Sequence, residues 1–387
     1  MNFDTLKKVL LLFCFLITNS SKSQAIETNK QQLPPVIYSG LQGKFHVQGI
    51  AIDQEKGYMY FSFTTKLVKT DLQGNLIGSV EGLTGHLGCL TFNPETKRLY
   101  GSLEYKNDAI GKGIAGEDAS RRESAFYIAI FDTEKITSPR LNAEKDNIMT
   151  TVYLKEVVDD YYATDTNNGK VVEHRYGCSG IDGVTFAPEV GKKLGKTFLY
   201  VAYGIYSDNK RTDNDYQVLL AYDTKCWGKY EHTLSQENRH KQGPSKPDDK
   251  YFVFTGNTTY GIQNLAYDPA SGNTYAAVYK GKKDHYPNYS LFIIDWSKPI
   301  RKMQLKGFDR KEIQKTLTLY PQGLYDKNSG IHGWNFPWGT TGLCPLGNGY
   351  FYISHESDKP EQSSTVHLYQ WTGDLEQPFR LIPQSGK

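Results

Sequence analysis

The chain consists largely of short runs in which apolar and aromatic residues alternate with polar or glycine positions. Such runs, separated by Gly, Asn, Asp and Pro, are typical of β-strands joined by tight turns. They come in pairs, each with a strand that opens near a glycine, a turn, and an aromatic second strand. The pairs recur at 46–63, 86–103, 180–203, 261–278 and 339–354. A pattern that returns at regular intervals predicts an all-β protein built from structural repeats.

Each pair continues into a third run, and four of the pairs continue into a fourth. Third strands are predicted at 66–71, 126–132, 218–223, 290–295 and 365–369, and fourth strands at 76–80, 150–154, 251–255 and 315–319. Four antiparallel strands per repeat, arranged around an axis, define a β-propeller. We therefore predict a five-bladed β-propeller of four-stranded antiparallel blades, a single domain over 26–387. The predicted blades are 46–83, 84–154, 178–256, 257–320 and 338–383.

A further apolar run at 36–40 precedes the first pair. We interpret it as an outer strand that pairs onto the last blade and closes the ring. Closure of this kind removes exposed sheet edges, which otherwise pair with other chains.

The repeats resemble the β-propeller superfamily over essentially the whole chain after its first 25 residues. Five-bladed propellers of the glutaminyl cyclase type also open their blades with short glycine-containing runs. The glutamates at the channel entrance of that family have no matching positions in this sequence. The corresponding ring here consists of Gln48, Gly88, Asp182, Gln263 and Thr341. The resemblance therefore implies the fold and leaves the activity open.

The first 25 residues have the features of a secretory signal peptide. Lys7 and Lys8 precede an apolar run at 9–17, and small residues suit cleavage after Ala25. The apolar run is too short to span a bilayer as a helix. We expect a secreted or periplasmic protein.

The charge balance excludes some classes of partner. The net charge is only +3, and no run of basic residues suggests a nucleic-acid or anionic-membrane footprint. The 28 tyrosines supply flat rings suited to stacking on sugars. We expect a monomer that binds an extracellular glycan or a small molecule, with no nucleic-acid partner and no membrane insertion.

Propeller geometry narrows the search for a site. The first strand of each blade lines the central channel, and it begins on the face where the second strand ends. Long connections also leave from this face, and binding residues concentrate on such loops. The residues that we predict for catalysis are His46, His86, Arg175, Tyr176 and Tyr203. Those that we predict for substrate binding are Gln48, Glu104, His174, Gln263, Tyr279, Trp338 and His355.

Two histidines stand at the same position of adjacent repeats. His46 and His86 could act as acid–base groups or metal ligands, because imidazole titrates near neutral pH. Their equivalence could equally reflect repeat ancestry, with each ring bonded to neighbouring backbone. Asp182 is the predicted metal ligand, for a divalent cation such as calcium, although a channel-lining carboxylate also suits a water chain.

The run Glu173-His174-Arg175-Tyr176 supplies a base, a cation and a phenol. A uronate lyase needs this chemistry: His46 or His86 would remove a proton, Arg175 would neutralise the carboxylate, and Tyr176 or Tyr203 would return the proton. A plain surface loop explains the run about as well. A glycoside hydrolase would instead need two opposed carboxylates, for which Glu104, Asp182 and Glu356 are available.

Two classes of function therefore stay open. The first is a carbohydrate-active enzyme, either a uronate-type polysaccharide lyase or a glycoside hydrolase. The second is a non-catalytic propeller that binds a glycan or a protein through the same face.

Overall fold

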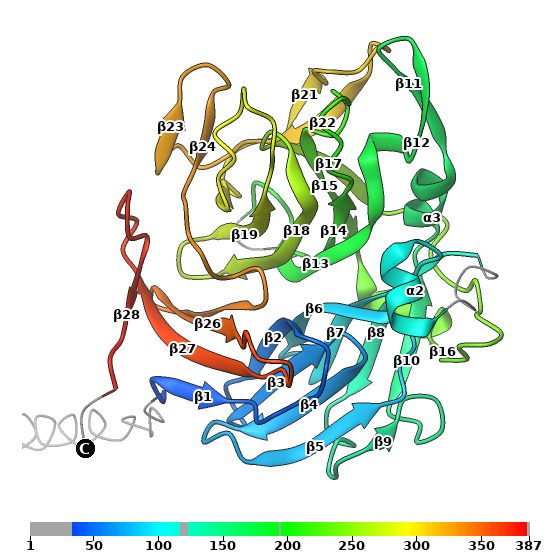
Figure 1. Cartoon of the computed structure of the whole chain (residues 1–387), viewed down its shortest axis with the longest axis vertical. Coiled ribbons are helices and arrows are strands. Elements are labelled where there is room, and N and C mark those ends of the chain that lie inside the picture. The colour runs from blue at the N-terminus through cyan, green and yellow to red at the C-terminus, as the bar shows by residue number, and fades with distance from the viewer. Residues whose placement is uncertain (1–32, 117–122, 193–194, 385–387) are drawn as a thin grey trace, which may run out of the picture. The chain divides into compact units, whose positions relative to one another are not determined.

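Five β-sheets follow one another along the chain and stand around a common axis in a computed structural model (Figure 1). The structure describes residues 33–116, 123–192 and 195–384, so the leader predicted over 1–25 lies outside the described residues. The predicted all-β, five-bladed propeller is confirmed. Successive strands of each blade pair as antiparallel neighbours, as expected when short turns join consecutive strands.

The first three blades each contain four antiparallel strands and carry further strands at their outer edges. The first contains β2 (Val47–Asp53), β3 (Tyr58–Phe63), β4 (Lys66–Asp71), β5 (Leu76–Glu81) and the edge strand β9 (Leu141–Asn142). The second contains β6 (His86–Asn93), β7 (Arg98–Tyr105), β8 (Ala125–Asp132), β10 (Met149–Tyr153) and the edge strand β16 (His232–Thr233). The third contains β13 (Cys178–Pro188), β14 (Thr197–Ile205), β15 (Tyr216–Tyr222) and β17 (Asp249–Phe254), extended by β22 (Ile313–Leu317) and β21 (Arg301–Gln304).

The fourth blade departs from this plan. Its continuous ladder contains only β18 (Thr258–Asp268), β19 (Asn273–Lys280) and β20 (Leu291–Ile294). The run predicted as its fourth strand, 315–319, is shared between two blades: Thr316 pairs in parallel with Phe252 of β17. Further along, the Thr318 carbonyl accepts a hydrogen bond from the Asp295 amide at 2.9 Å. The hairpin β21–β22 therefore extends the third blade, and the chain then closes the edge of the fourth.

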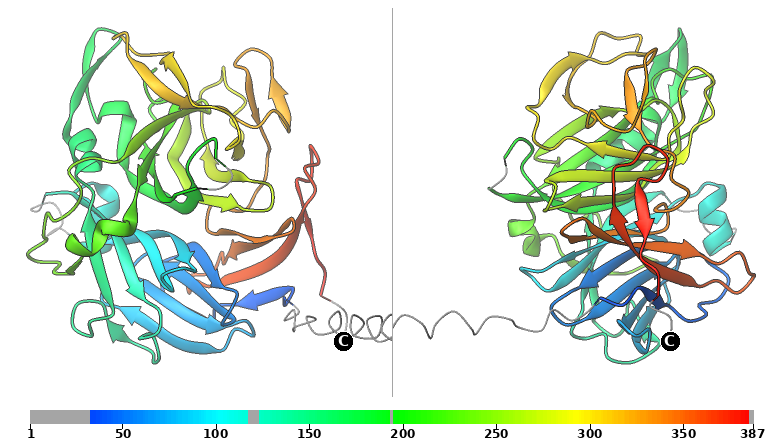
Figure 2. Two further views of the ribbon diagram at one scale, coloured as in Figure 1. Left: turned by 180° about the vertical axis from the view of Figure 1, so that it is seen from behind. Right: turned by 90° about the vertical axis from the view of Figure 1, so that its left-hand side faces the viewer.

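Both ends of the described chain meet on the fifth blade. Its ladder contains β25 (Leu343–Gly347), β26 (Tyr350–Glu356) and β27 (Ser364–Trp371). The outer edge of β27 pairs with β1 (Val36–Tyr38) over one half and with β28 (Phe379–Leu381) over the other. In Figure 2 the N-terminal strand accordingly lies beside the red C-terminal blade. The strand β1 falls within the run 36–40 that was predicted to close the ring.

Helices and small hairpins occupy the connections between strands. These are α2 (Ala109–Ala115), α3 (Lys155–Tyr162), the 3₁₀ segments η2 (Arg175–Gly177) and η3 (Thr224–Lys229), the hairpin β11 (Thr164–Asn167)–β12 (Lys170–Glu173) and the hairpin β23 (Leu324–Asp326)–β24 (Ile331–Gly333). Of the helices in the described part of the chain, none is both long and apolar enough to cross a membrane.

Glycines let the inner strands approach one another closely near the axis. A Cβ added at Gly49 would lie 2.8 Å from the Cys89 Cα, and one at Gly183 would lie 2.9 Å from the Leu265 Cβ. Real Cβ atoms do not tolerate such distances without movement of the backbone. Glycine is therefore the residue that fits at these two positions without a shift of the neighbouring strand.

We expect Gly49→Ala to lower the free energy of unfolding by about 1–3 kcal/mol, because the added methyl overpacks against the backbone of the next blade. Chemical denaturation measures this change. Gly228→Ala is the matched control, because among the described residues its added Cβ would meet no heavy atom within 4 Å. Equal stability of the two variants would contradict the close packing of the inner strands.

Candidate functional site

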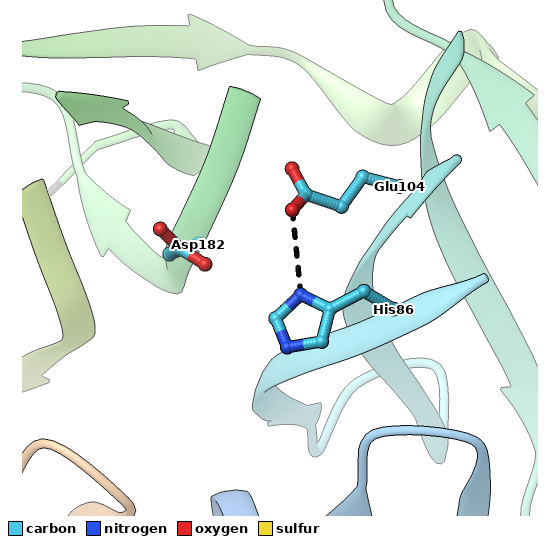
Figure 3. A group of neighbouring side chains, drawn as sticks. All are labelled: His86, Glu104 and Asp182. Carbon is cyan, nitrogen blue, oxygen red and sulfur yellow. Dashed lines mark ion pairs between the residues drawn. The ribbon is translucent and has the colours of Figure 1, made fainter. Parts of the chain in front are cut away.

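Three polar side chains from neighbouring blades converge at one end of the axis (Figure 3). His86 begins β6, and Glu104 lies directly opposite it on β7. Asp182 belongs to β13 of the next blade and sits within a register shift between Ile181 and Val184. A bulge of this kind re-aims a side chain. One nitrogen of His86 and one carboxylate oxygen of each acidic residue all lie within 4.8 Å of one another. We call these three residues the axial cluster.

Glu104 is the most constrained member of the axial cluster. It is 3% exposed, and its Oε1 lies 2.7 Å from Lys106 Nζ and 3.4 Å from His86 Nδ1. Its Oε2 accepts the Ile181 amide at 3.1 Å. Burial opposes ionisation, but Lys106 and His86 outweigh it and lower the pKa of Glu104. Glu104 is therefore an ionised, immobile carboxylate that forms a buried ion pair with Lys106.

Asp182 behaves in the opposite way. Burial first, and then the charge of Glu104, raise the pKa of Asp182 well above its ordinary value of 3.8. Lys106 and a hydrogen bond that Gln263 Nε2 donates to Asp182 Oδ2, at 3.2 Å, oppose this shift without reversing it. The pKa values of the two carboxyl groups are thus shifted in opposite directions, the pattern by which paired carboxyl groups acquire different acid–base roles.

The spacing of the cluster would also suit a metal ion, and Asp182 was the predicted ligand. Calcium prefers six to eight oxygen ligands. Here Glu104 is occupied by Lys106, by a backbone amide and by His86, and the Lys106 ammonium already supplies positive charge beside it. The donor set therefore fits a salt-bridge network better than it fits calcium.

His46 lies just before β2 at the same end of the axis. Its Nε2 is 2.7 Å from Gln48 Nε2, which also donates to Thr64 Oγ1 at 3.1 Å. Desolvation by surrounding residues lowers the pKa of His46 below 6.5. Glu356 opposes this shift, His86 adds to it, and the bond with Gln48 opposes it. A neutral imidazole is therefore maintained at lower pH than in a free histidine.

These influences predict two opposite changes in the pKa of His46, measurable by NMR titration of its ring. We expect Glu356→Gln to lower this pKa further, because a stabilising negative charge is removed. We expect His86→Gln to raise it, because a repelling group is lost. His332, whose pKa is lowered by burial alone, should titrate identically in all variants. If the pKa of His46 in both variants equalled that in the wild type, the placement of Glu356 and His86 near His46 would be contradicted.

Blades four and five complete this end of the axis. Gln263 bonds Asp182 as described, and burial followed by the charge of Glu356 raises the pKa of Tyr279 to about 12. The Trp338 ring stacks on His355 at 3.7 Å between centroids with 10° between planes. His355 Nε2 also lies 2.9 Å from the Tyr369 hydroxyl. Of the predicted binding residues in these two blades, Gln263 and Tyr279 are therefore near Asp182, whereas Trp338 and His355 form a stack of their own.

Three of the predicted catalytic residues, Arg175, Tyr176 and Tyr203, bond to acidic residues outside the axial cluster. Asp160 of α3 is fully buried, forms ion pairs with Arg175 and Lys250, and accepts a 2.7 Å hydrogen bond from the Tyr203 hydroxyl. The Tyr176 hydroxyl donates to Glu312 Oε1 at 2.6 Å. The structure therefore places Arg175 and Tyr203 together around Asp160, in a network that attaches α3 to the third blade.

The remaining predicted binding residue, His174, precedes η2 and packs between two tyrosines. Sequence reasoning missed Lys106 and Asp160. Lys106 could have been found, because it follows Glu104 by two positions directly after β7, and extended residues two apart share a face. Asp160 carries no comparable signal, because its importance depends on where α3 docks.

A small cavity opens beside the axial cluster. Its volume is about 160 Å³, and it lies between His86, Glu104 and Lys106 on one side and Ile110 and Ile114 of α2 on the other. Helix α2 packs closely there: a Cβ at Gly111 would lie 1.7 Å from the Lys106 carbonyl oxygen. Two members of the axial cluster, His86 and Glu104, therefore line a cavity with polar and apolar walls, as is common for small-ligand sites.

Comparisons with known proteins identify no family. No family model matches the chain, and no curated protein matches it. Among solved structures, the chain is similar to the glutaminyl cyclase of Myxococcus xanthus, with 9% identity and a TM-score of 0.35 over 86% of this chain and 94% of that chain. We infer neither activity nor site residues from this likeness.

Proposed function

We propose that the protein binds an extracellular carbohydrate at the axial cluster and cleaves it by acid–base chemistry. The observation that carries the proposal is the convergence of His86, Glu104 and Asp182 within 4.8 Å of one another, with His86 and Glu104 also lining a cavity. The pKa of Asp182 is raised, which favours its protonated form, and that of His46 is lowered, which favours its neutral form. Perturbed groups of opposite kind beside a cavity are typical of catalytic sites.

The reaction that these groups fit best is β-elimination at a uronate. His46 would take the proton from C5, and the electron pair of the broken C5–H bond would form the C4=C5 double bond. The C4–O4 bond would break, and Asp182 would give its proton to the departing oxygen. His86, whose Nε2 faces away from Glu104 in Figure 3, would hold the uronate carboxylate. No oxidant or reductant is needed.

Glycoside hydrolysis is the second candidate. Retaining hydrolases hold two carboxyl groups about 5 Å apart, and oxygens of Asp182 and Glu104 lie within 4.8 Å. Glu104, however, is 3% exposed and already engaged by three partners, which leaves it poorly placed to attack a sugar. Elimination is therefore the better match.

A panel of uronate-containing and neutral polysaccharides tests the proposal, with reducing ends and ultraviolet absorbance recorded together. Elimination predicts that both signals rise, because the product contains a conjugated double bond. Hydrolysis predicts reducing ends alone. Binding without cleavage, measured by calorimetry, would favour the non-catalytic alternative, and absence of both binding and cleavage would overturn the proposal.

A further inference from the structure

We infer that a groove built around His174 and Tyr206 is a second sugar subsite, which takes a neutral sugar unit beyond the cleaved bond; this rests on the proposed function above. The groove has a volume of about 500 Å³. It is lined by Val172, Glu173, His174, Tyr206, Asp208 and Arg211, among others. The proposed function makes no use of these residues.

The aromatic rings of the groove pack against buried rings of the protein core. The His174 imidazole lies between Tyr161 and Tyr206, with centroid distances of 4.6 and 4.7 Å. Tyr161 is buried and contacts Phe126 of the second blade at 5.2 Å. The stack therefore rests on the core, and His174 and Tyr206 remain partly exposed at its outer end. Rigid, partly exposed rings bind a ligand with little loss of conformational freedom.

The backbone at this point is strained. His174 has φ 62° and ψ 82°, and Tyr176 has φ 58°, both in the left-handed region that residues with side chains rarely adopt. Arg211 holds the segment by donating to the carbonyls of Glu173 at 2.6 Å and His174 at 2.9 Å. Strain of this kind is commonly retained where a side chain must be aimed at a ligand.

Tyr206 of the groove lies within electrostatic reach of the axial cluster. Burial, a hydrogen bond with Tyr161, and the nearby charges of Asp108 and Glu104 raise the pKa of Tyr206. Asp108 in turn lies 3.7 Å from the ammonium of Lys106. Helices α2 and α3 and the β11–β12 hairpin lie on the same side of the propeller in Figures 1 and 2. One saccharide chain could therefore contact both places.

The charges of the groove indicate which sugar it takes. Glu173 and Asp208 are exposed carboxylates, whereas Arg211, the guanidinium among the described lining residues, is paired with Asp213 at 2.8 Å. A uronate would be repelled here, while hydroxyl groups could bond the carboxylates and a sugar face could stack on the rings. The inferred substrate is therefore a mixed polysaccharide, in which a neutral sugar neighbours the uronate.

The test compares mixed oligosaccharides of increasing length on His174→Asn. Asparagine tolerates the left-handed backbone but removes the ring. We expect kcat/KM for the longer oligosaccharides to fall about fivefold to tenfold, with the shortest cleaved fragment unaffected. Tyr206→Leu should act in the same way and serves if the first variant folds poorly.

Tyr325→Ala is the matched control. Like Tyr206, Tyr325 stacks on a histidine: its ring centroid lies 4.4 Å from that of His332, and the residue is 52% exposed. It belongs, however, to the β23–β24 hairpin and not to the groove. It should leave every substrate unchanged. An unaltered dependence on length in both His174→Asn and Tyr206→Leu, with an active wild type, would overturn the subsite alone. A wild type that neither binds nor cleaves any oligosaccharide would overturn the proposed function as well.

Discussion

Asp182→Asn is expected to lower kcat by about 10²- to 10⁴-fold, the usual contribution of a general acid. The amide keeps the shape of the side chain and its contact with Gln263 but has no proton to give to the departing oxygen. Steady-state kinetics on the polysaccharide identified by the panel measures the loss. Asp132→Asn, at an exposed turn that ends β8, is the control and should retain full activity.

The same variant should be at least as stable as the wild type at neutral pH. The folded state keeps the Asp182 proton to higher pH than the unfolded state, whose carboxyl group ionises near 3.8. As pH rises above 3.8, ionisation therefore favours the unfolded state, and the neutral amide removes this penalty.

Wild-type activity should also fall on the alkaline side as Asp182 ionises and on the acid side, below pH 6.5, as His46 becomes protonated. Full activity of Asp182→Asn would contradict the role of Asp182.

Asp160→Ala is expected to lower the free energy of unfolding by about 3–5 kcal/mol, because Arg175 and Lys250 lose their fully buried partner and Lys250 keeps its ion pair with Glu156 alone. Denaturant unfolding measures this loss. Asp159→Ala is the matched control on the same helix, since Asp159 forms an exposed ion pair with Lys155 and the expected loss is under about 1 kcal/mol.

Tyr203→Phe tests whether Tyr203 holds α3 in place through Asp160 or takes part in catalysis. It removes one hydroxyl bond to Asp160 and should cost about 1 kcal/mol, with kcat unchanged. The sequence had suggested that Tyr203 and Arg175 act on substrate. A large fall in kcat with unchanged stability would support that role and contradict the anchoring interpretation.

The blades could be predicted because alternation of apolar and polar residues is a local signal that repeats along the chain. The edge strands were harder, because pairing there depends on which neighbouring edge is open. The run 315–319 shows this: its apolar pattern predicts a strand, but its first part joins Phe252 of the third blade rather than the fourth blade.

The candidate site was only partly predictable for a similar reason. Equal repeat positions pointed to His46 and His86, and strand pairing placed Glu104 opposite His86. The protonation states could not be predicted, because they depend on burial and on the ion pair with Lys106. The partner of Arg175 could not be predicted either, because α3 brings Asp160 to it from a separate element.

The most direct test is an NMR titration of the histidine rings in Asp182→Asn, with a mixed uronate oligosaccharide that this variant binds without consuming. The account predicts that the signals of His46 and His86 shift with saturation, while His332 on the β23–β24 hairpin stays unchanged. Saturable binding that moves neither His46 nor His86 would contradict the claim that the end of the propeller axis is the carbohydrate site.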